Sequence, residues 1–314
     1  MDNEILLECQ DLVKTFGTLH AVDGLSLQVG AGEMVGLVGP DGAGKTTAIR
    51  LFCGALQPTS GSIRVAGFAV PGQVEKAREK IGYLAQRFSL YGDLTVKENL
   101  DFFGEVFEIS PAERENRSRE LLRFAGLEEF SNRPAAALSG GMQKKLGLAS
   151  ALVHRPKVLL LDEPTGGVDP SARQEFWHLL INLLREGSAV LVSTPYMDEA
   201  TRFNRVVFMN HGKALIQGAP RELIGQLTGR ILELAAEPQA AARKIATTDP
   251  DVEDVHAFGG YLHLRVRSPE GPLTRLPGRL AEAGVNMQHL QLVTPTLEDV
   301  FMQLVEMESV PDGK

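Results

Sequence analysis

The stretch GLVGPDGAGKTT, residues 36–47, decides the fold. Ile5–Glu8 and Leu25–Val29 read as strands before it. A short apolar run, Met34–Val38, leads into it, and a helical pattern follows from Lys45 to about Cys53. The sequence Gly39–Thr46 fits the phosphate-binding pattern G-x-x-x-x-G-K-[ST], and a strand before it and a helix after it are the context that this pattern requires. We therefore expect an α/β fold built around a nucleotide-binding P-loop.

The chemistry of this loop follows from its residue types. Glycines let the backbone curl so that successive N–H groups face inward and cradle phosphate oxygens, and the helix N-terminus adds positive potential. Lys45 can reach the terminal phosphates, and the Thr46 hydroxyl is suited to bind Mg²⁺. The candidate nucleotide-binding residues of the loop are Gly39, Pro40, Asp41, Gly42, Ala43, Gly44, Lys45, Thr46 and Thr47.

A second candidate segment is the apolar strand starting at Val158, which ends in two carboxylates, Asp162 and Glu163. At the carboxyl edge of a parallel sheet, these carboxylates would face the phosphate loop. Asp162 can then hold Mg²⁺ directly or through water, and Glu163 can polarise an attacking water molecule. A strand that ends in Asp-Glu is weak evidence alone, and it gains weight here from the phosphate loop.

The turn Ser139-Gly140-Gly141 precedes a helix that extends to about Val153, and it lies between the phosphate loop and the acidic pair. It makes a second helix N-terminus that can bind an anion, although an ordinary capped helix after a flexible turn would look the same. In this order, the phosphate loop, the Ser-Gly-Gly turn and the acidic pair resemble the ABC ATPase cassette. The resemblance covers roughly residues 4–222.

This resemblance implies a fold and a working unit. The fold is an α/β P-loop NTPase cassette with a RecA-like α/β core, an antiparallel β subdomain and a helical subdomain at about residues 87–153. The implied cofactors are ATP and Mg²⁺. In this family the Ser-Gly-Gly signature of one cassette closes over the ATP that another cassette holds, so a single chain does not complete its own site.

Three further site residues follow from the resemblance alone. Phe16 resembles the aromatic residue that stacks on adenine, and its alternative is a core phenylalanine. Gln86 resembles the glutamine that senses Mg²⁺ and leads into the membrane-coupling surface. Asp169 resembles the aspartate of the loop that crosses the cassette interface, and it would also serve as an N-cap. The resemblance thus assigns catalysis to Lys45, Gln86 and Glu163, and Mg²⁺ binding to Thr46, Gln86 and Asp162.

One position departs from the family pattern. A histidine normally follows the strand after the acidic pair, directly before a sequence such as Tyr196–Ala200, and Pro195 stands there instead. Proline has no side-chain donor, so it cannot contact the terminal phosphate or orient the attacking water. The nearby His211 lies in a hairpin turn, where we expect it to be solvated. Because Glu163 is retained, we expect ATP binding with slowed hydrolysis at the site of this chain, rather than a dead site.

The character of the sequence changes around residues 218–228. Strand-like and helix-like segments then follow, and they predict a small α+β domain over residues 228–308. They include a hairpin Val255–Val266 that turns at Gly259-Gly260 and a helix-like segment Leu276–Ala283. The ending, Thr296–Phe301, resembles the tail domain of ABC-2 type drug-export ATPases.

Two segments narrow the resemblance further. Residues 36–47 and Gly166–Pro170 resemble the N-terminal cassette of tandem exporter ATPases of the YbhF type, in which the histidine is also replaced. Because the chain stops after the tail, we expect separate partners. These are a second cassette, in a heterodimer or a homodimer, and ABC-2 type membrane permease subunits that select the substrate.

Composition restricts the setting in which the chain works. A formal net charge of -8 over 314 residues disfavours a nucleic-acid partner, which normally meets a basic face. No apolar run approaches the roughly 20 residues of a membrane helix, and the acidic start is not a secretory signal. Cys9 and Cys53 make no metal pattern and are expected to be reduced. We expect a peripheral protein on the cytoplasmic face of the inner membrane, held by membrane subunits.

The favoured function is the ATP-binding and ATP-hydrolysing subunit of an ABC-2 type exporter, which couples ATP-driven cassette dimerisation to efflux. Two alternatives remain: a soluble ABC-type ATPase of DNA repair or translation, and a regulatory nucleotide-binding module without turnover. The first usually carries a coiled-coil insertion, zinc cysteines or two cassettes, whereas this chain has two cysteines, one phosphate loop and no long heptad run. Only Pro195 favours the second alternative.

Overall fold

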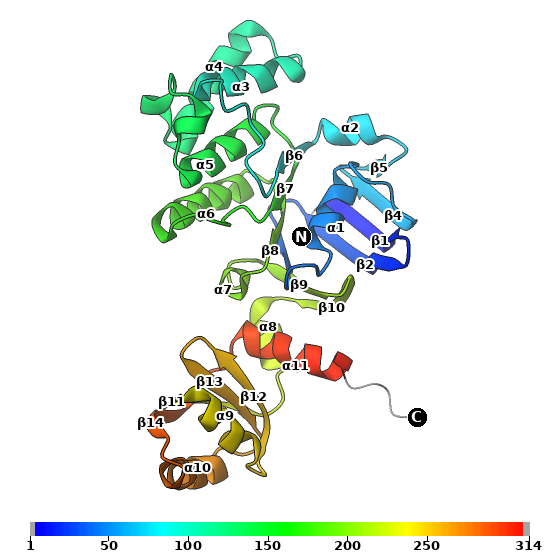
Figure 1. Ribbon diagram of the computed structural model, residues 1–314. Coiled ribbons are helices and arrows are strands. Elements are labelled where there is room, and N and C mark those ends of the chain that lie inside the picture. Colours follow the sequence, from blue (N-terminus) through cyan, green and yellow to red (C-terminus); the bar gives the residue numbers. More distant parts are fainter. Residues whose placement is uncertain (1–3, 310–314) are drawn as a thin grey trace. The chain divides into compact units, whose positions relative to one another are not determined.

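The computed structural model describes residues 4–309, which form two compact units (Figure 1). The first unit extends to Ala219 and the second unit begins at Pro220. Each unit is built on β-sheet and has a hydrophobic core of its own.

A six-stranded sheet forms the centre of the first unit. Its strand order is β10-β9-β3-β8-β7-β6, and all neighbours are parallel except β10, which pairs antiparallel with β9. Strands β3, β7 and β8 are buried along their whole length, as expected for parallel strands that are covered on both faces. The strands are β3 (Met34–Val38), β6 (Ile81–Leu84), β7 (Val158–Asp162), β8 (Ala189–Thr194), β9 (Arg205–Asn210) and β10 (Lys213–Gly218).

Three of these strands end next to one another. Strand β3 ends at Val38, β7 at Asp162 and β8 at Thr194, and β8 pairs in parallel with both of the others. Parallel neighbours have their carboxyl ends at the same edge of a sheet. The phosphate loop, the acidic pair and the loop that carries Pro195 therefore leave the sheet at one edge.

A second, antiparallel sheet of the first unit has the order β2-β1-β4-β5 and shares its core with the central sheet. Its first two strands are longer than the predicted Ile5–Glu8 and Leu25–Val29. The β1–β2 register shifts between Cys9 and Leu12, and such a bulge interrupts the alternation of apolar residues by which a strand is recognised. The strands are β1 (Ile5–Phe16), β2 (Leu19–Gly30), β4 (Ser60–Val65) and β5 (Phe68–Val70).

Helices make up the rest of the first unit, and α3, α4 and α5 pack against one another as a group (Figure 1). Side-chain caps fix the N-termini of two of them. Thr95 forms a capping box with Glu98 at the start of α3, and Ser110 accepts the Glu113 N–H at the start of α4. The helices are α1 (Lys45–Phe52), α2 (Val74–Arg78), α3 (Val96–Val106), α4 (Pro111–Ala125), α5 (Gly140–Ala151), α6 (Pro170–Arg185) and α7 (Met197–Ala200).

The second unit is an antiparallel sheet of order β12-β13-β11-β14, with α9 and α10 packed against it. The predicted hairpin is confirmed, since Phe258 of β12 pairs with Tyr261 of β13. Helix α10 starts at Glu270, earlier than the predicted Leu276, and continues through Pro277. The elements are α8 (Pro220–Gly225), β11 (Arg230–Glu237), α9 (Gln239–Thr247), β12 (Val252–Phe258), β13 (Tyr261–Val266), α10 (Glu270–Glu282), β14 (Asn286–Val293) and α11 (Leu297–Ser309).

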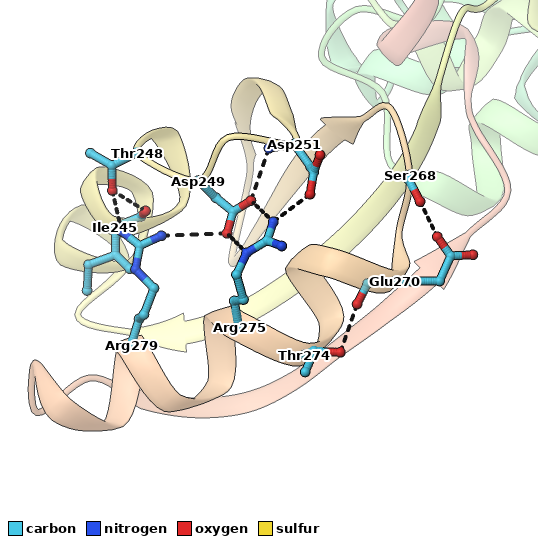
Figure 2. A network of polar contacts seen from close by, with 9 residues as sticks. All are labelled: Ile245, Thr248, Asp249, Asp251, Ser268, Glu270, Thr274, Arg275 and Arg279. Carbon is cyan, nitrogen blue, oxygen red and sulfur yellow. Dashed lines mark hydrogen bonds and ion pairs between the residues drawn. The ribbon is translucent and has the colours of Figure 1, made fainter.

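A network of charged groups ties α10 to the segment between α9 and β12 (Figure 2). The buried Asp249 carboxylate accepts hydrogen bonds from Arg275 Nε at 3.0 Å and Arg275 Nη2 at 2.6 Å, and Arg279 Nη1 lies 3.6 Å away. Arg275 also donates to Asp251 at 2.6 Å. Hydrogen bonding to Arg275 holds the pKa of Asp249 below its usual value. The pairing explains why an ionised carboxylate is tolerated at a buried position.

Two predictions from composition are tested by the structure. Among residues 4–309, none of the helices has the length and apolar character needed to cross a membrane. Cys9 is buried, Cys53 is half-buried, and both are free thiols, as predicted. Burial raises the pKa of the Cys9 thiol to about 12, so this side chain is an unreactive part of the core.

Candidate functional site

The phosphate loop joins the end of β3 to the start of α1. Gly44 caps α1 with φ 102°, and a Cβ atom there would lie 2.3 Å from the Ala21 carbonyl oxygen, so only glycine fits. Lys45 is 4% exposed, and its ammonium donates to the carbonyl oxygens of Gly39 at 2.7 Å and Pro40 at 2.9 Å. Burial lowers the pKa of Lys45. The lysine thus curls back over its own loop.

A cleft of about 340 Å³ opens above this loop. Phe16 is 48% exposed and lines the cleft, so it is not the core phenylalanine that the sequence left open. The Lys14 ammonium lies 5.0 Å from the centre of the Phe16 ring. The other lining residues include Leu19, His20, Asp41, Lys45, Thr46, Thr47, Glu163 and His211.

Two histidines among these lining residues were not predicted to belong to the site. His20 belongs to β2, and His211 lies in the exposed turn between β9 and β10. The sequence places His211 in a solvated hairpin, which is correct, but it gives no sign that this turn reaches the phosphate loop. The contact is visible in the backbone, where the Gly212 N–H donates to the Ala43 carbonyl at 3.1 Å.

Asp162 lies against the start of α1. Its side chain is 1% exposed, and Oδ1 accepts hydrogen bonds from Thr46 Oγ1 at 2.9 Å and Ser193 Oγ at 2.5 Å. The structure therefore brings the two predicted magnesium ligands, Thr46 and Asp162, into direct contact. A hydroxyl and a carboxylate are hard oxygen donors of the kind that Mg²⁺ prefers, so the residues fit that ion. Ser193 was not predicted, because no motif marks it.

Glu163 is held at both ends. Its backbone has φ 45°, and its N–H donates to Ser193, whose carbonyl and hydroxyl oxygens each lie 3.1 Å away. Its carboxylate accepts a 2.7 Å hydrogen bond from Gln86 Nε2. Two residues predicted to serve catalysis are thus hydrogen-bonded to each other.

The remaining predicted residues lie elsewhere. Ser139 caps α5 by accepting the Met142 N–H at 3.4 Å. Asp169 caps α6 by accepting the N–H groups of Ser171 at 3.1 Å and Ala172 at 3.0 Å, as predicted. Neither residue lines the cleft above Lys45, and Gly140 and Gly141 do not line it either. Gly140 instead lines a smaller cavity of about 180 Å³ together with Gln86, so the Ser-Gly-Gly turn lies beside the Gln86 loop and outside the cleft above Lys45.

The loop that carries Pro195 is anchored by a buried glutamate. Glu199 is 1% exposed and accepts hydrogen bonds from Thr194 Oγ1 at 2.7 Å and Thr165 Oγ1 at 2.5 Å. Burial raises the pKa of Glu199. Arg173 of α6 lies 5.2 Å from the centre of the Tyr196 ring. The Pro195 loop is therefore fixed to the segment that joins Glu163 to Asp169.

Family models match both parts of the chain. Residues 22–166 match the model described as "ABC transporter". Residues 218–305 match the model described as "ATP-binding protein DrrA1-3-like, C-terminal domain".

Curated relatives match nearly the whole chain. The Escherichia coli protein "Probable multidrug ABC transporter ATP-binding protein YbhF" is 39% identical over 309 residues, covering 96% of this chain and 52% of the relative, so the chain spans about half the length of that protein. The Ralstonia nicotianae "Nod factor export ATP-binding protein I" is 37% identical over 308 residues, covering 96% of this chain and 94% of the relative.

Solved structures match the first unit. A structure titled "Structure of ATP binding subunit of ABC transporter" is 30% identical, with a TM-score of 0.64, and covers 70% of this chain and 92% of that one. A dimeric post-hydrolysis state of the cassette MJ0796 bound to ADP and Pi is 28% identical, with a TM-score of 0.63, and covers 68% of this chain and 98% of that one.

Proposed function

Because this chain belongs to the ABC transporter family of ATP-binding subunits, we propose that it binds ATP above Lys45 and hydrolyses it to drive export by separate membrane subunits. The observation that carries the proposal is the contact between Thr46 of the phosphate loop and Asp162 of the acidic pair. In this proposal residues 4–222 are the ATP-binding cassette and residues 228–308 are an accessory domain.

Phosphate binding uses the loop from Gly39 to Thr47. Its backbone N–H groups and the N-terminus of α1 receive the phosphates, and the Lys45 ammonium leaves the Gly39 and Pro40 carbonyls to contact the terminal phosphates. A charge-assisted bond to phosphate is stronger than a bond to a neutral carbonyl, which favours this exchange. The exposed Phe16 ring offers a face on which the adenine stacks.

Hydrolysis is assigned to residues at the carboxyl ends of β6 and β7 and at the start of α1. Thr46, Asp162 and Gln86 would hold Mg²⁺, which when bound neutralises negative charge on the phosphates. Glu163 polarises the attacking water and accepts its proton. Gln86 already bonds the Glu163 carboxylate, so it orients this base as well as responding to the ion. Pro195 supplies no donor at this edge, and we expect turnover at this site to be slowed.

The position of the Ser-Gly-Gly turn and of Asp169 outside the cleft above Lys45 favours a two-chain site. Ser139, Gly140, Gly141 and Asp169 do not line the cleft above Lys45. In the proposed dimer, they meet the nucleotide that a second cassette holds. The partner is a different cassette in a heterodimer, or a second copy of this chain.

An apolar cavity of about 450 Å³ in the first unit is the proposed contact with a membrane subunit. The walls include Tyr83, Leu90, Phe103, Phe107 and His154. Burial lowers the pKa of His154 to about 4, so its ring is neutral where it stacks on Phe107. The cavity shares Leu84, Ser89 and Leu90 with a smaller one that contains Gln86.

We assign this cavity to an apolar segment of an ABC-2 type permease subunit, which would hold the chain at the cytoplasmic face of the membrane. Because this cavity shares lining residues with the one that contains Gln86, a movement of the docked segment would reach the nucleotide site through the Gln86 loop. The names of two relatives, a multidrug transporter protein and a Nod factor export protein, favour export as the direction of transport.

The test measures binding and turnover separately. The purified chain should bind a fluorescent ATP analogue that unlabelled ATP displaces, and phosphate release should require Mg²⁺. Removal of Mg²⁺ with a chelator should stop release while nucleotide binding persists in weaker form. Co-purification of membrane proteins with the tagged chain from detergent extracts tests the transport assignment. Binding without turnover, even with its partners present, would instead favour the regulatory module.

A further inference from the structure

Lys144 lies on α5, five positions beyond its cap Ser139, and no motif marks it. Its ammonium donates a 2.6 Å hydrogen bond to the Gln86 carbonyl oxygen. Longer contacts join it to the carbonyl oxygens of Ala85 at 3.5 Å and Glu163 at 3.4 Å. A single side chain of α5 therefore contacts the segments that follow both β6 and β7.

Helix α5 is packed closely against α6 and β6. A Cβ atom at Gly141 would lie 2.6 Å from Ala172 Cβ of α6, and one at Gly147 would lie 2.6 Å from Leu84 Cδ1 of β6. Glycine at both positions allows the helix backbone to approach these elements. Because α5 is packed this closely and is a rigid element, a displacement of its N-terminus would also move Lys144.

The Lys144 side chain is half-buried and lies near the two carboxylates of the site. Burial lowers its pKa, and the nearby carboxylates of Asp162 and Glu163 act against that effect. The next residue, Lys145, points to a different element and pairs with Glu175 of α6. The two adjacent lysines thus contact different elements, and Lys144 is the one that contacts the predicted site.

We propose that Lys144 is a positioning residue that couples the Ser139–Gly141 turn to Gln86 and Glu163, so that nucleotide contact at the turn sets hydrolysis at this chain's own site. The inference rests on the proposed function. Gln86 is held at both ends, because Lys144 bonds its carbonyl while its amide bonds the Glu163 carboxylate. A movement of α5 therefore reorients Gln86 and, through it, Glu163.

This arrangement gives a two-cassette assembly a link between its sites. The Ser139–Gly141 turn would meet the partner's ATP, and Glu163 would serve the ATP bound by this chain. When the turn contacts the partner's ATP, Lys144 holds Gln86 and Glu163 in one arrangement. When the turn is released, the hydrogen bond from Lys144 to Gln86 weakens and both residues regain freedom of movement. Such a link is a coupling between two binding events.

The test compares Lys144→Met, which removes the charge and keeps the length, with Lys144→Arg, which keeps the charge, and with the matched control Lys145→Met. We expect Lys144→Met to lower kcat about tenfold or more while leaving ATP affinity nearly unchanged, a split that points to lost positioning rather than lost binding. Lys144→Arg should recover most of the rate, and Lys145→Met should resemble wild type.

Hydrogen exchange gives a readout that does not need turnover. Lys144→Met should speed exchange in residues 85–90, and Lys145→Met should not. In wild type, ATP should slow exchange in residues 139–144 and 85–90 together, and Lys144→Met should separate the two responses.

Each outcome has one meaning. If wild type does not bind ATP, the proposed function fails, and the nucleotide-free exchange comparison still decides whether Lys144 ties the two segments. If wild type binds ATP and Lys144→Met matches Lys145→Met in rate and exchange, the inference is overturned. It is also overturned if Lys144→Met melts earlier and loses ATP binding, because Lys144 would then only hold the fold.

Discussion

Gln86 and Glu163 lie 77 positions apart in the chain, yet the Gln86 amide donates a 2.7 Å hydrogen bond to the Glu163 carboxylate. The parallel pairing of β6 with β7 brings them together, because each residue comes shortly after the carboxyl end of its strand. The Glu163 N–H is fixed to Ser193 of β8. The proposed base is therefore positioned by three neighbouring strands of the central sheet.

Replacing this carboxylate tests its assigned role. Glu163→Gln keeps the size of the side chain and removes its ability to accept a proton, so Mg-ATP binding should persist while hydrolysis slows. A positioned general base contributes roughly 10²- to 10⁴-fold, and because Pro195 already limits the site we expect a drop near the lower end. Cassette dimers should accumulate in Mg-ATP on size-exclusion chromatography.

The control for this variant is Glu186→Gln, which changes an exposed glutamate at the end of α6. It should hydrolyse ATP at the wild-type rate. Equal phosphate release by Glu163→Gln and wild type would mean that Glu163 is not the main catalytic carboxylate.

A second prediction concerns nucleotide affinity. Lys45→Ala removes the ammonium that now bonds Gly39 and Pro40 and that we assign to the terminal phosphates. Losing a charge-assisted contact costs about 1.5–3 kcal/mol, which corresponds to roughly 10- to 150-fold weaker ATP binding. Calorimetry at matched salt measures it, with Lys76→Ala on the exposed face of α2 as control. Unchanged affinity in Lys45→Ala would contradict the assignment.

A third prediction concerns the stability of the second unit. Because Arg275 holds the pKa of Asp249 below its usual value, the unfolded chain binds a proton more readily than the folded one. The stabilising effect is therefore present above the ordinary aspartate pKa and is lost as the pH falls through the depressed folded-state pKa. Asp249→Asn should destabilise the protein at neutral pH by about 1.5–3 kcal/mol, the range for a hydrogen bond to a charged group.

Thermal unfolding followed from neutral to acidic pH checks this prediction. The difference between wild type and Asp249→Asn should shrink as the pH falls, because protonation removes the charge from wild type too. Asp251→Asn is the matched control, since Asp251 also bonds Arg275 but its side chain is 37% exposed. A difference that stays constant with pH, or an equal loss from Asp251→Asn, would show that the buried charge is not responsible.

Ordered motifs made much of the fold predictable. The phosphate loop between a strand and a helix, the acidic pair and the Ser-Gly-Gly turn predicted an ABC cassette, and the solved relatives confirm that fold class. The small C-terminal domain was predicted separately, from the strand-like and helix-like segments after residue 228. Each motif needs a fixed backbone shape or a fixed set of side chains, so it can be recognised in the sequence without knowledge of the tertiary structure. The roles assigned to Lys45, Glu163 and the other site residues stay predictions.

Features that depend on tertiary contacts were not predictable. Strands β1 and β2 were assigned too short, because bulges break the alternation that marks a strand. Helix α10 was assigned too short because Pro277 looks like a boundary, whereas Leu276 and Leu280 pack into the core on either side of it. The contacts of Ser193 and Lys144 join segments distant in sequence, so no local spacing reveals them.

The last prediction concerns the asymmetry of a two-cassette assembly. Pro195 follows β8 at the edge that carries Lys45 and Asp162, so it affects the nucleotide that this chain holds. Ser139 caps α5 away from that cleft and would complete the partner's site. A partner that keeps a histidine should therefore carry most of the turnover, at the site that this chain's Ser-Gly-Gly turn completes.

Two substitutions separate these sites. Pro195→His should raise the rate modestly, since the loop is already anchored by Glu199 through Thr194 and a histidine would add the missing donor. Ser139→Arg should be far more damaging, because it removes the cap of α5 and puts a bulky cation where a helix N-terminus must meet phosphate. The measurement is the ATPase rate of each variant in complex with the partner cassette. If the purified chain alone, as a homodimer, already hydrolyses ATP at the full rate of the complex, the asymmetric assembly is wrong, and another group performs the work of the absent histidine.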